Sequence, residues 1–256
     1  MVSVTPAKSA MLASVNLLPL QTAKSVQQSL KRFADPVRAT LSQRYFKTGP
    51  GQYAEGDRFI GVTVPLQRSI VQKFRHISLP EIKKLLVSKI HEERLTALLL
   101  LVYQYENGTP ETRKAIYKIY LGHTEHINNW DLVDSSAPYI VGPWLDSQTD
   151  GRPALEKLAA SKLIWERRIA VLATFYYIKA GQFDLSLRLA EQLMQDPHDL
   201  IHKAVGWMLR EIGKRDISVL RQFLNANYHR MPRTMLRYAI ERFDATERQR
   251  YLRGEI

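Results

Sequence analysis

The sequence predicts an all-α fold, arranged as an α-solenoid of paired helices with a concave, basic groove. Three observations carry this prediction. Apolar residues recur at helical spacing from about Thr22 onward. Strand-like alternation with hairpin turns is hard to find. Similar helices also return after about 35 residues. We expect residues 1–20, which lack a clear period, to form a loosely ordered lead-in, and residues 21–256 to form a single domain.

Helix-start signals divide the chain into elements. Residues 78–81 (SLPE) have the pattern of a capping box with proline in the first turn. Residues 109–111 (TPE) place proline where the first helical residue belongs. The pairs Asp196-Pro197 and Met231-Pro232 precede later helices in the same way. Each signal predicts a helix that begins directly after it.

The period is visible in four helices that share a small residue among apolar ones, with a basic residue nearby. The small residues are Ala97, Ala170, Ala204 and Ala239, at intervals of 73, 34 and 35 residues. The first interval is close to two repeats, and its midpoint falls in residues 127–134, INNWDLVD. Helix pairs at this period are typical of a solenoid, whose stacked units form a curved surface. A helical bundle with an accidental near-period is the alternative.

One segment interrupts the helical pattern. Residues 48–65, TGPGQYAEGDRFIGVTVP, contain four glycines and two prolines and predict a loop. Closely spaced glycines suggest a phosphate-binding loop, but no Gly-Lys-Ser/Thr follows them, which argues against a nucleotide P-loop. We expect a structured connection between the first helices and the solenoid.

Composition narrows the class of protein. Lysine and arginine number 37 against 25 aspartates and glutamates, a net charge of +12, so a polyanion such as DNA or RNA is a natural partner. Many proteins this basic bind no nucleic acid, and that alternative stays open. Cysteine is absent, which excludes disulfides, thiolate nucleophiles and cysteine metal ligands and fits a reducing cytoplasm. Without a membrane-length apolar run or a secretory signal, we expect a cytoplasmic protein that does not bind membranes.

Residues 127–134 place an aromatic ring and two acids in one short stretch. Asp134 follows Trp130 by four residues, so in a helix both project from one face. Asp131, next to two asparagines, has the pattern of a capping or first-turn residue. Two interpretations of Asp134 remain open. It pairs with an arginine of the next helix, or it forms with the indole a site for a substrate that becomes cationic.

Neighbouring repeats add residues at the equivalent level. Arg167 and Arg168 fall one repeat after these residues, and Trp207 falls two repeats after them. Because stacked repeats place equivalent helices side by side, we expect a single groove. Its predicted lining comprises Trp130, Asp134, Arg168 and Trp207, flanked by Lys203 and Arg210.

Other patterns are weaker. His123 and His126 are spaced i, i+3 without a third ligand, so we expect a solvated loop rather than a metal site. No Gly-x-Ser-x-Gly motif or cysteine suggests a nucleophilic triad. The basic run 248–253 fits a solvated face or a secondary phosphate contact.

The segments INNWDLVDSSA, WERRIAVLATF, HDLIHKAVGWMLREIGK and RTMLRYAIE, in this order, resemble the AlkD-type DNA alkylation repair family, the HEAT-like-repeat DNA glycosylases. The resemblance covers about residues 40–245. It implies a monofunctional, monomeric glycosylase without cofactor or metal. Such an enzyme excises cationic alkylated purines, such as 3-methyladenine and 7-methylguanine, from double-stranded DNA while the damaged nucleotide stays stacked. In the cell it would be associated with the nucleoid.

The resemblance also implies roles for individual residues. Asp134 would be the catalytic carboxylate, and Trp130 and Trp207 would contact the deoxyribose of the lesion. Arg168, rather than Arg167, would hold the adjacent phosphate, and Tyr45 would lie near the lesion. An alkylated purine already carries positive charge and leaves without a general acid, so a carboxylate that stabilises the cationic sugar is sufficient chemistry.

Two alternatives belong to other functional classes. One is a non-catalytic helical-repeat module that binds DNA structures or protein partners. An inactive relative is expected to lack the acid at Asp134 or the indole at Trp130, and this chain has both. The other is an RNA-binding repeat protein that reads one base per repeat. It needs recurring polar triplets on one helix position, and the sequence does not show them.

Overall fold

The computed structural model describes residues 20–148 and 151–256, and these residues form an all-helical protein, as predicted. Their single β feature is an isolated bridge between Arg58 and Ile90. Within the described ranges, no helix has the length and apolar character needed to cross a membrane. The predicted lead-in, residues 1–20, lies outside the described residues except for Leu20.

The helices follow one another with short connections. In chain order they are α1 (Ala23–Lys31), α2 (Pro36–Tyr45), α3 (Val64–Lys73), α4 (Leu79–Leu86), α5 (His91–Asn107), α6 (Pro110–Leu121), the 3-10 helix η1 (Thr124–His126), α7 (Trp130–Asp134), α8 (Ala137–Asp146), α9 (Arg152–Ala159), α10 (Ile164–Ala173), α11 (Phe175–Lys179), α12 (Asp184–Gln192), α13 (Asp199–Gly213), α14 (Ile217–Asn227), α15 (Arg233–Ala239) and α16 (Ala245–Arg253).

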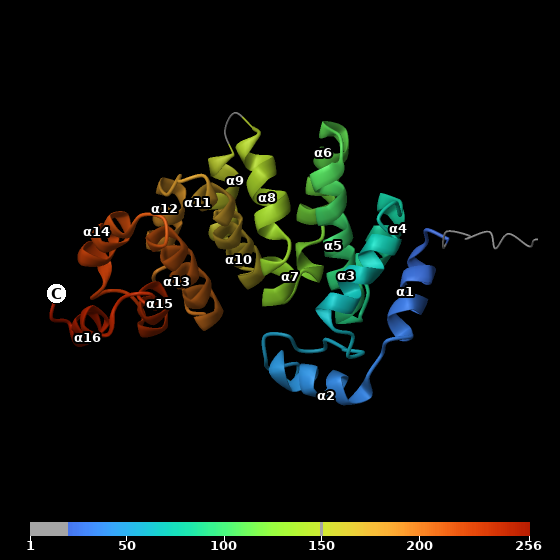
Figure 1. Cartoon of the computed structure of the whole chain (residues 1–256), viewed down its shortest axis with the longest axis horizontal. Coiled ribbons are helices and arrows are strands. Elements are labelled where there is room, and N and C mark those ends of the chain that lie inside the picture. Colours follow the sequence, from blue (N-terminus) through green and yellow to red (C-terminus); the bar gives the residue numbers. More distant parts are fainter. Residues whose placement is uncertain (1–19, 149–150) are drawn as a thin grey trace, which may run out of the picture.

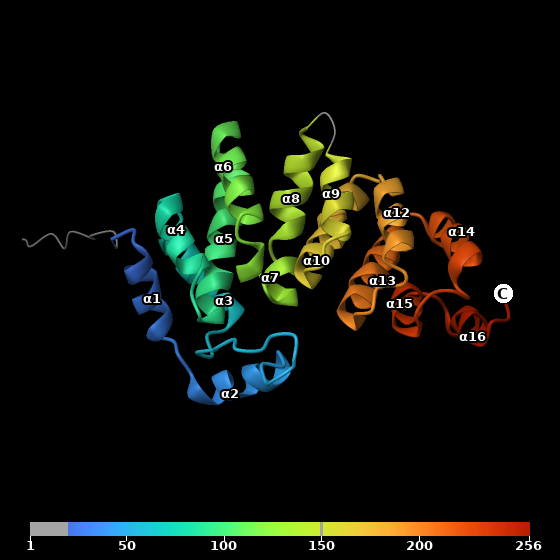
Figure 2. The same cartoon turned by 180° about the vertical axis from the view of Figure 1, so that it is seen from behind.

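The helices stand side by side in an arc, with α2 beneath α3 and α5 (Figures 1 and 2). One row runs through α5, α7, α10, α13 and α15, each in contact with the next. This row contains the predicted repeat positions. Their alanines, Ala97, Ala170, Ala204 and Ala239, are fully buried, because a small residue lets adjacent helices approach closely. The predicted α-solenoid is confirmed. Helix α7 occupies the repeat position that the sequence placed midway between Ala97 and Ala170.

Helices α13 and α15 approach each other closely. A Cβ atom on Gly206 would lie 2.5 Å from the carbonyl oxygen of Met235 and 2.6 Å from Cβ of Tyr238. Both distances are shorter than real contacts, so this crossing depends on glycine.

The helix-start signals are confirmed as boundaries but not all as caps. Thr109 caps α6, because its side chain accepts a hydrogen bond from the Thr112 amide. The predicted capping box at residues 78–81 is wrong: Ser78 makes no side-chain cap bond. The Glu81 carboxylate instead accepts a hydrogen bond from the Ala23 amide at 2.7 Å. It therefore ties α4 to the start of α1.

The glycine-rich segment is a structured connection, as predicted. The Glu92 carboxylate, at the start of α5, accepts hydrogen bonds from the backbone amides of Ile60, Gly61 and Val62 at 2.7–3.3 Å. Gly61 has a φ of 81°, and a Cβ atom there would lie 2.1 Å from the Asp35 carbonyl oxygen. These contacts hold α2 and the following loop in place, although every residue of α2 remains at least partly exposed.

Candidate functional site

Residues 127–134 fold around the short helix α7. The Asn129 side chain accepts a hydrogen bond from the Trp130 amide and forms the cap. Leu132 and Val133 are fully buried and anchor the helix to the core. Trp130 and Asp134 therefore occupy the two ends of a fixed turn, and both line the same pocket.

Asp131 was predicted to be a capping or first-turn residue. It is the first-turn residue of α7, and Asn129 is the cap. The Asp131 carboxylate instead accepts a hydrogen bond from Nε2 of His91, on α5, at 2.8 Å. The second acid of this stretch therefore joins two repeats.

The structure brings all seven predicted site residues to one pocket of about 500 Å³. They come from α2, α7, α10 and α13. The repeat spacing predicted that the residues of α7, α10 and α13 would lie together, whereas Tyr45, at the end of α2, was expected only from the resemblance. The pocket is lined by Tyr45, Trp130, Asp134, Arg168, Lys203, Trp207 and Arg210, together with Lys47, Tyr53, His198, Asp199, Leu200 and Tyr238.

Asp134 and Arg168 form a bidentate ion pair between neighbouring helices. Arg168 Nε donates to Asp134 Oδ1 at 2.9 Å, and Nη2 donates to Oδ2 at 2.8 Å. A third donor, Nη1, bonds to the Leu200 carbonyl at 2.6 Å. The pairing with an arginine of the next helix, one of the two interpretations of Asp134, is thus present.

The ion pair is nearly buried, since the side chains of Arg168 and Asp134 are 6% and 16% exposed. Burial raises the pKa of the Asp134 carboxyl, and the Arg168 guanidinium opposes this rise. Each carboxylate oxygen can still accept a second hydrogen bond. The pocket therefore presents an oriented acid that retains acceptor capacity.

An internal repeat distinguishes Arg168 from Arg167. Residues 88–97 (SKIHEERLTA) align with residues 161–170 (SKLIWERRIA), which places Arg94 and Arg167 in equivalent positions. Both guanidinium groups donate to the carbonyl of the serine that begins the segment, at 2.8 and 3.0 Å, and both pair with an aspartate at 2.6 Å. Arg167 therefore has a structural role outside the pocket, whereas Arg168 replaces an apolar residue and lines it.

Both tryptophans are held by other side chains. Trp130 stacks on Phe46, with ring centroids 5.2 Å apart, and meets the edge of Tyr45 at 6.0 Å. Trp207 Nε1 donates to Glu211 at 3.2 Å. The two indoles are partly buried against the core. Tyr45 is 67% exposed, so its contact with Trp130 covers little of it.

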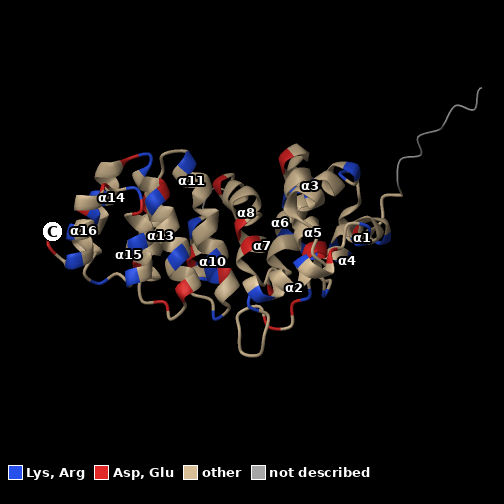
Figure 3. Ribbon diagram, turned by 60° about the horizontal axis from the view of Figure 1, so that its bottom comes forward, with Lys and Arg blue, Asp and Glu red and all other residues tan. Residues whose placement is uncertain are grey.

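Cations surround the acid. Lys203 pairs with Asp199 at 2.8 Å, and Arg210 pairs with Glu241 of the following repeat. Lysine and arginine segments appear along α10, α13, α15 and α16 in Figure 3, while acidic segments lie on α7. The pocket thus combines two carboxylates, Asp134 and Asp199, with four cationic side chains, those of Lys47, Arg168, Lys203 and Arg210.

A sequence model of a known family describes most of this chain. The model for the DNA alkylation repair enzymes matches residues 26–243. The chain belongs to the DNA alkylation repair enzyme family. All residues that line the pocket fall inside the matched segment.

A solved structure shows the same fold. It is described as a predicted DNA alkylation repair enzyme from Enterococcus faecalis, and it is 15% identical with a TM-score of 0.65. The match covers 83% of this chain and 97% of that one. No curated protein matches the sequence.

Several site residues of this DNA alkylation repair family member were not predicted. Tyr238 lies one 35-residue interval after Lys203, so the period itself would have located it. Tyr53 lies in the glycine-rich connection and Lys47 lies directly before it. Neither segment belongs to the 35-residue repeat, so the spacing could not locate these two residues. The bonds of His91 to Asp57 and Asp131, behind the pocket, were not predicted either, because they join separate elements.

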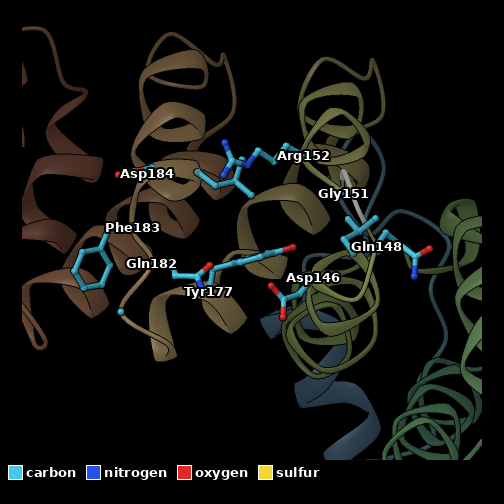
Figure 4. A pocket seen from close by; sticks show the side chains of 11 residues that line it. Asp146, Gln148, Gly151, Arg152, Tyr177, Gln182, Phe183 and Asp184 are labelled. Atoms are coloured by element: carbon cyan, nitrogen blue, oxygen red, sulfur yellow. The ribbon is translucent and has the colours of Figure 1, made fainter. Parts of the chain in front are cut away.

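Two further features lie outside this site. His123 Nδ1 contacts the Ile119 carbonyl at 2.7 Å, and the described part of the chain contains no cluster of three or more residues placed to hold a metal. A second pocket, of about 630 Å³, lies where the chain enters α9 and α12, with Asp146, Arg152 and Tyr177 among its walls (Figure 4). None of the predicted site residues lines it.

Proposed function

We propose that this protein is a DNA glycosylase that hydrolyses the N-glycosidic bond of cationic alkylated purines, such as 3-methyladenine and 7-methylguanine, in duplex DNA. The observation that carries the proposal is the Asp134 carboxylate, held by Arg168 in one pocket with Trp130 and Trp207. Membership of the DNA alkylation repair family and the net charge of +12 support it.

The residues of the pocket suit this reaction. An N3- or N7-alkylated purine carries a positive charge, so it departs as a neutral base with the electron pair of the C1′–N bond. The positive charge passes to the sugar, where the Asp134 carboxylate and the faces of the two indoles stabilise it. Water then adds to C1′ and loses a proton, and Asp134 is placed to orient that water.

Arg168 supports this chemistry in two ways. Its bidentate bond orients the carboxylate and favours the ionised form. Three of its five N–H groups are used by Asp134 and Leu200, so two remain for a phosphate oxygen beside the lesion.

DNA is held chiefly through its phosphates in this proposal. Lys47, Lys203 and Arg210 lie at the same pocket as the acid, and affinity that depends on them falls steeply with salt. A pocket built from two indoles and a carboxylate can receive a sugar, so the damaged base need not leave the stack. One copy of the chain supplies every lining residue, so a monomer suffices.

The test is release of 7-methylguanine from methylated duplex DNA under single-turnover conditions. The Asp134→Asn variant should lose about 100-fold or more in rate while it retains DNA affinity. Asp196→Asn is the matched control, because it disrupts the comparable Arg167 ion pair outside the pocket. It should keep the rate at temperatures where it is folded. Absence of release by the wild type would leave a non-catalytic DNA-binding module as the function.

The tryptophans provide a second comparison. Trp130→Phe and Trp207→Phe should slow release more than they weaken binding to undamaged DNA, since each keeps a ring but loses indole surface. Trp165→Phe is the control, because Trp165 is buried and does not line the pocket. Equal losses in rate and binding would assign Trp130 and Trp207 to packing alone.

A further inference from the structure

We propose that His91 is a positioning residue: its imidazolium ring, held between Asp57 and Asp131, fixes helix α7 and the indole of Trp130 in the pocket. His91 lies on α5 and contacts neither the pocket nor any residue assigned to the reaction above. Its influence on Trp130 is a property of the free protein. Its influence on base release rests on the proposed function.

His91 is hydrogen-bonded at both ring nitrogens. Nδ1 donates to Asp57 at 3.0 Å, and Nε2 donates to Asp131 at 2.8 Å. Only the doubly protonated ring can donate hydrogen bonds to two carboxylates at once, because neutral imidazole has a single N–H. The residue is 1% exposed, so this is a buried cation.

The position of this cation is unusual for the fold. His91 is the first residue of α5, where the helix dipole disfavours positive charge. In the internal repeat, the equivalent of His91 is Ile164. The solenoid therefore does not need histidine at this position to pack its helices. Packing alone does not account for the ion pairs of His91 with Asp57 and Asp131.

Stacked rings connect His91 to the pocket. His91 stacks on Phe59 with centroids 4.3 Å apart, Phe59 stacks on Phe46 at 5.0 Å, and Phe46 stacks on Trp130 at 5.2 Å. The four rings come from α5, the glycine-rich connection, the end of α2 and α7. The charge at one end of this column attracts the neighbouring ring faces.

The second connection runs through the backbone. Asp131 directly follows Trp130, so the His91–Asp131 bond holds α7 at the residue next to the indole. The other oxygen of Asp131, Oδ1, is buried and has no hydrogen-bond partner among the described residues. The hydrogen bonding of Asp131 therefore depends on His91.

The remaining charges near His91 favour its protonated form. Arg94, on the same helix, opposes a second cation but is paired with Asp57 at 2.6 Å. Burial raises the pKa of Asp57, but the bonds from His91 and Arg94 outweigh burial and leave it lowered. Burial would lower the pKa of His91, but Asp131 and Asp57 outweigh it and raise that pKa to about 9. Asp134, on α7, faces Asp131 and adds negative charge to this side.

Deprotonation would leave one N–H for two carboxylates. Either Asp57 or Asp131 then loses its hydrogen bond, and the ring column loses its cation. Loss of the bond to Asp131 frees α7 beside Trp130. Loss of the bond to Asp57 leaves that carboxylate held by Arg94 and Asn128 alone, which weakens the hold on the connection that carries Phe59. Both outcomes alter the surroundings of the Trp130 ring.

The test uses the full chain labelled with 5-fluorotryptophan, without DNA. Its four tryptophans give fluorine NMR signals that single Trp→Phe variants assign. In the wild type, the Trp130 signal should shift with a midpoint near pH 9, as expected for His91. The Trp144 and Trp165 signals serve as internal controls and should not share that midpoint. In His91→Gln the Trp130 titration should disappear.

Asp131→Asn is the second variant, because it retains His91 but removes the nearer carboxylate. It should move the midpoint to lower pH, which a merely structural histidine would not do. A Trp130 signal that is insensitive to pH and to both substitutions would overturn the proposal. His123→Gln, at a histidine without a carboxylate at both ring nitrogens, should behave as the wild type.

Base release completes the test. At pH 7.5, His91→Gln should slow single-turnover release of 7-methylguanine by about tenfold or more, with little change in affinity for undamaged DNA. An unchanged rate would overturn the link to catalysis. If the wild type releases no base, the proposed glycosylase function fails, while the fluorine titration still decides whether His91 positions Trp130.

Discussion

The buried imidazolium of His91 should make the stability of the fold depend on pH. Its pKa is raised from 6.5 to about 9 in the folded protein. Between these values the folded protein retains a proton that the unfolded chain has released. The stabilisation is therefore complete below pH 6.5 and is lost as the pH rises to 9. The difference of about 2.5 pKa units corresponds to roughly 3 kcal/mol.

Urea unfolding followed by circular dichroism, at pH 6, 7, 8 and 9, measures this loss. The free energy of unfolding of the wild type should fall over this range by roughly 3 kcal/mol more than that of His91→Gln, which has no group to titrate there. Every other group titrates in both proteins, so the difference isolates His91. Parallel curves for the two proteins would refute the assignment of a buried imidazolium.

Three further changes test the packing around the site. Arg168→Met leaves Asp134 without its counter-charge and should lower the free energy of unfolding, measured by heat or urea, by about 3–5 kcal/mol. Adding Asp134→Leu should restore part of this loss, and no recovery in the double variant would contradict the pairing of Asp134 with Arg168. Glu92→Gln weakens the acceptor of three backbone amides and should lower the free energy of unfolding by roughly 1–3 kcal/mol. Proteases should cut the glycine-rich connection faster in this variant, and a cleavage pattern like that of the wild type would contradict the role of Glu92 in holding it. Gly206→Ala places a methyl group 2.5 Å from the Met235 carbonyl and should cost about 1–3 kcal/mol; an unchanged melting temperature would show that α13 and α15 separate freely.

The predictable part of the fold is the part that depends on neighbouring repeats. The 35-residue spacing of buried alanines located α7 in the series and brought Trp130, Arg168 and Trp207 to one pocket. This succeeds because equivalent helices of a solenoid lie next to each other. The same spacing, applied once more from Lys203, leads to Tyr238.

The part of the fold and site that could not be predicted depends on contacts that do not recur with the 35-residue repeat. Glu81 has the sequence context of a capping box, but its carboxylate is drawn to the free amide of Ala23 on another helix. Asp131 similarly follows two asparagines, yet its partner is His91, forty residues earlier. Local sequence describes what such acids can bind, whereas the tertiary fold decides which donor is nearest.

The two tryptophans of the pocket lie on α7 and α13, with α10 between them. The distance between their rings therefore spans two helix–helix contacts rather than one rigid element. Each contact in a solenoid contributes a small rotation, and these rotations add along the chain. The width of the pocket is thus set by the sum of these rotations. Substitutions behind α10, at Leu155 or Ala159 for example, can change that width without altering a lining residue. Relatives with the same lining residues but different packing behind them can in this way admit substrates of different size.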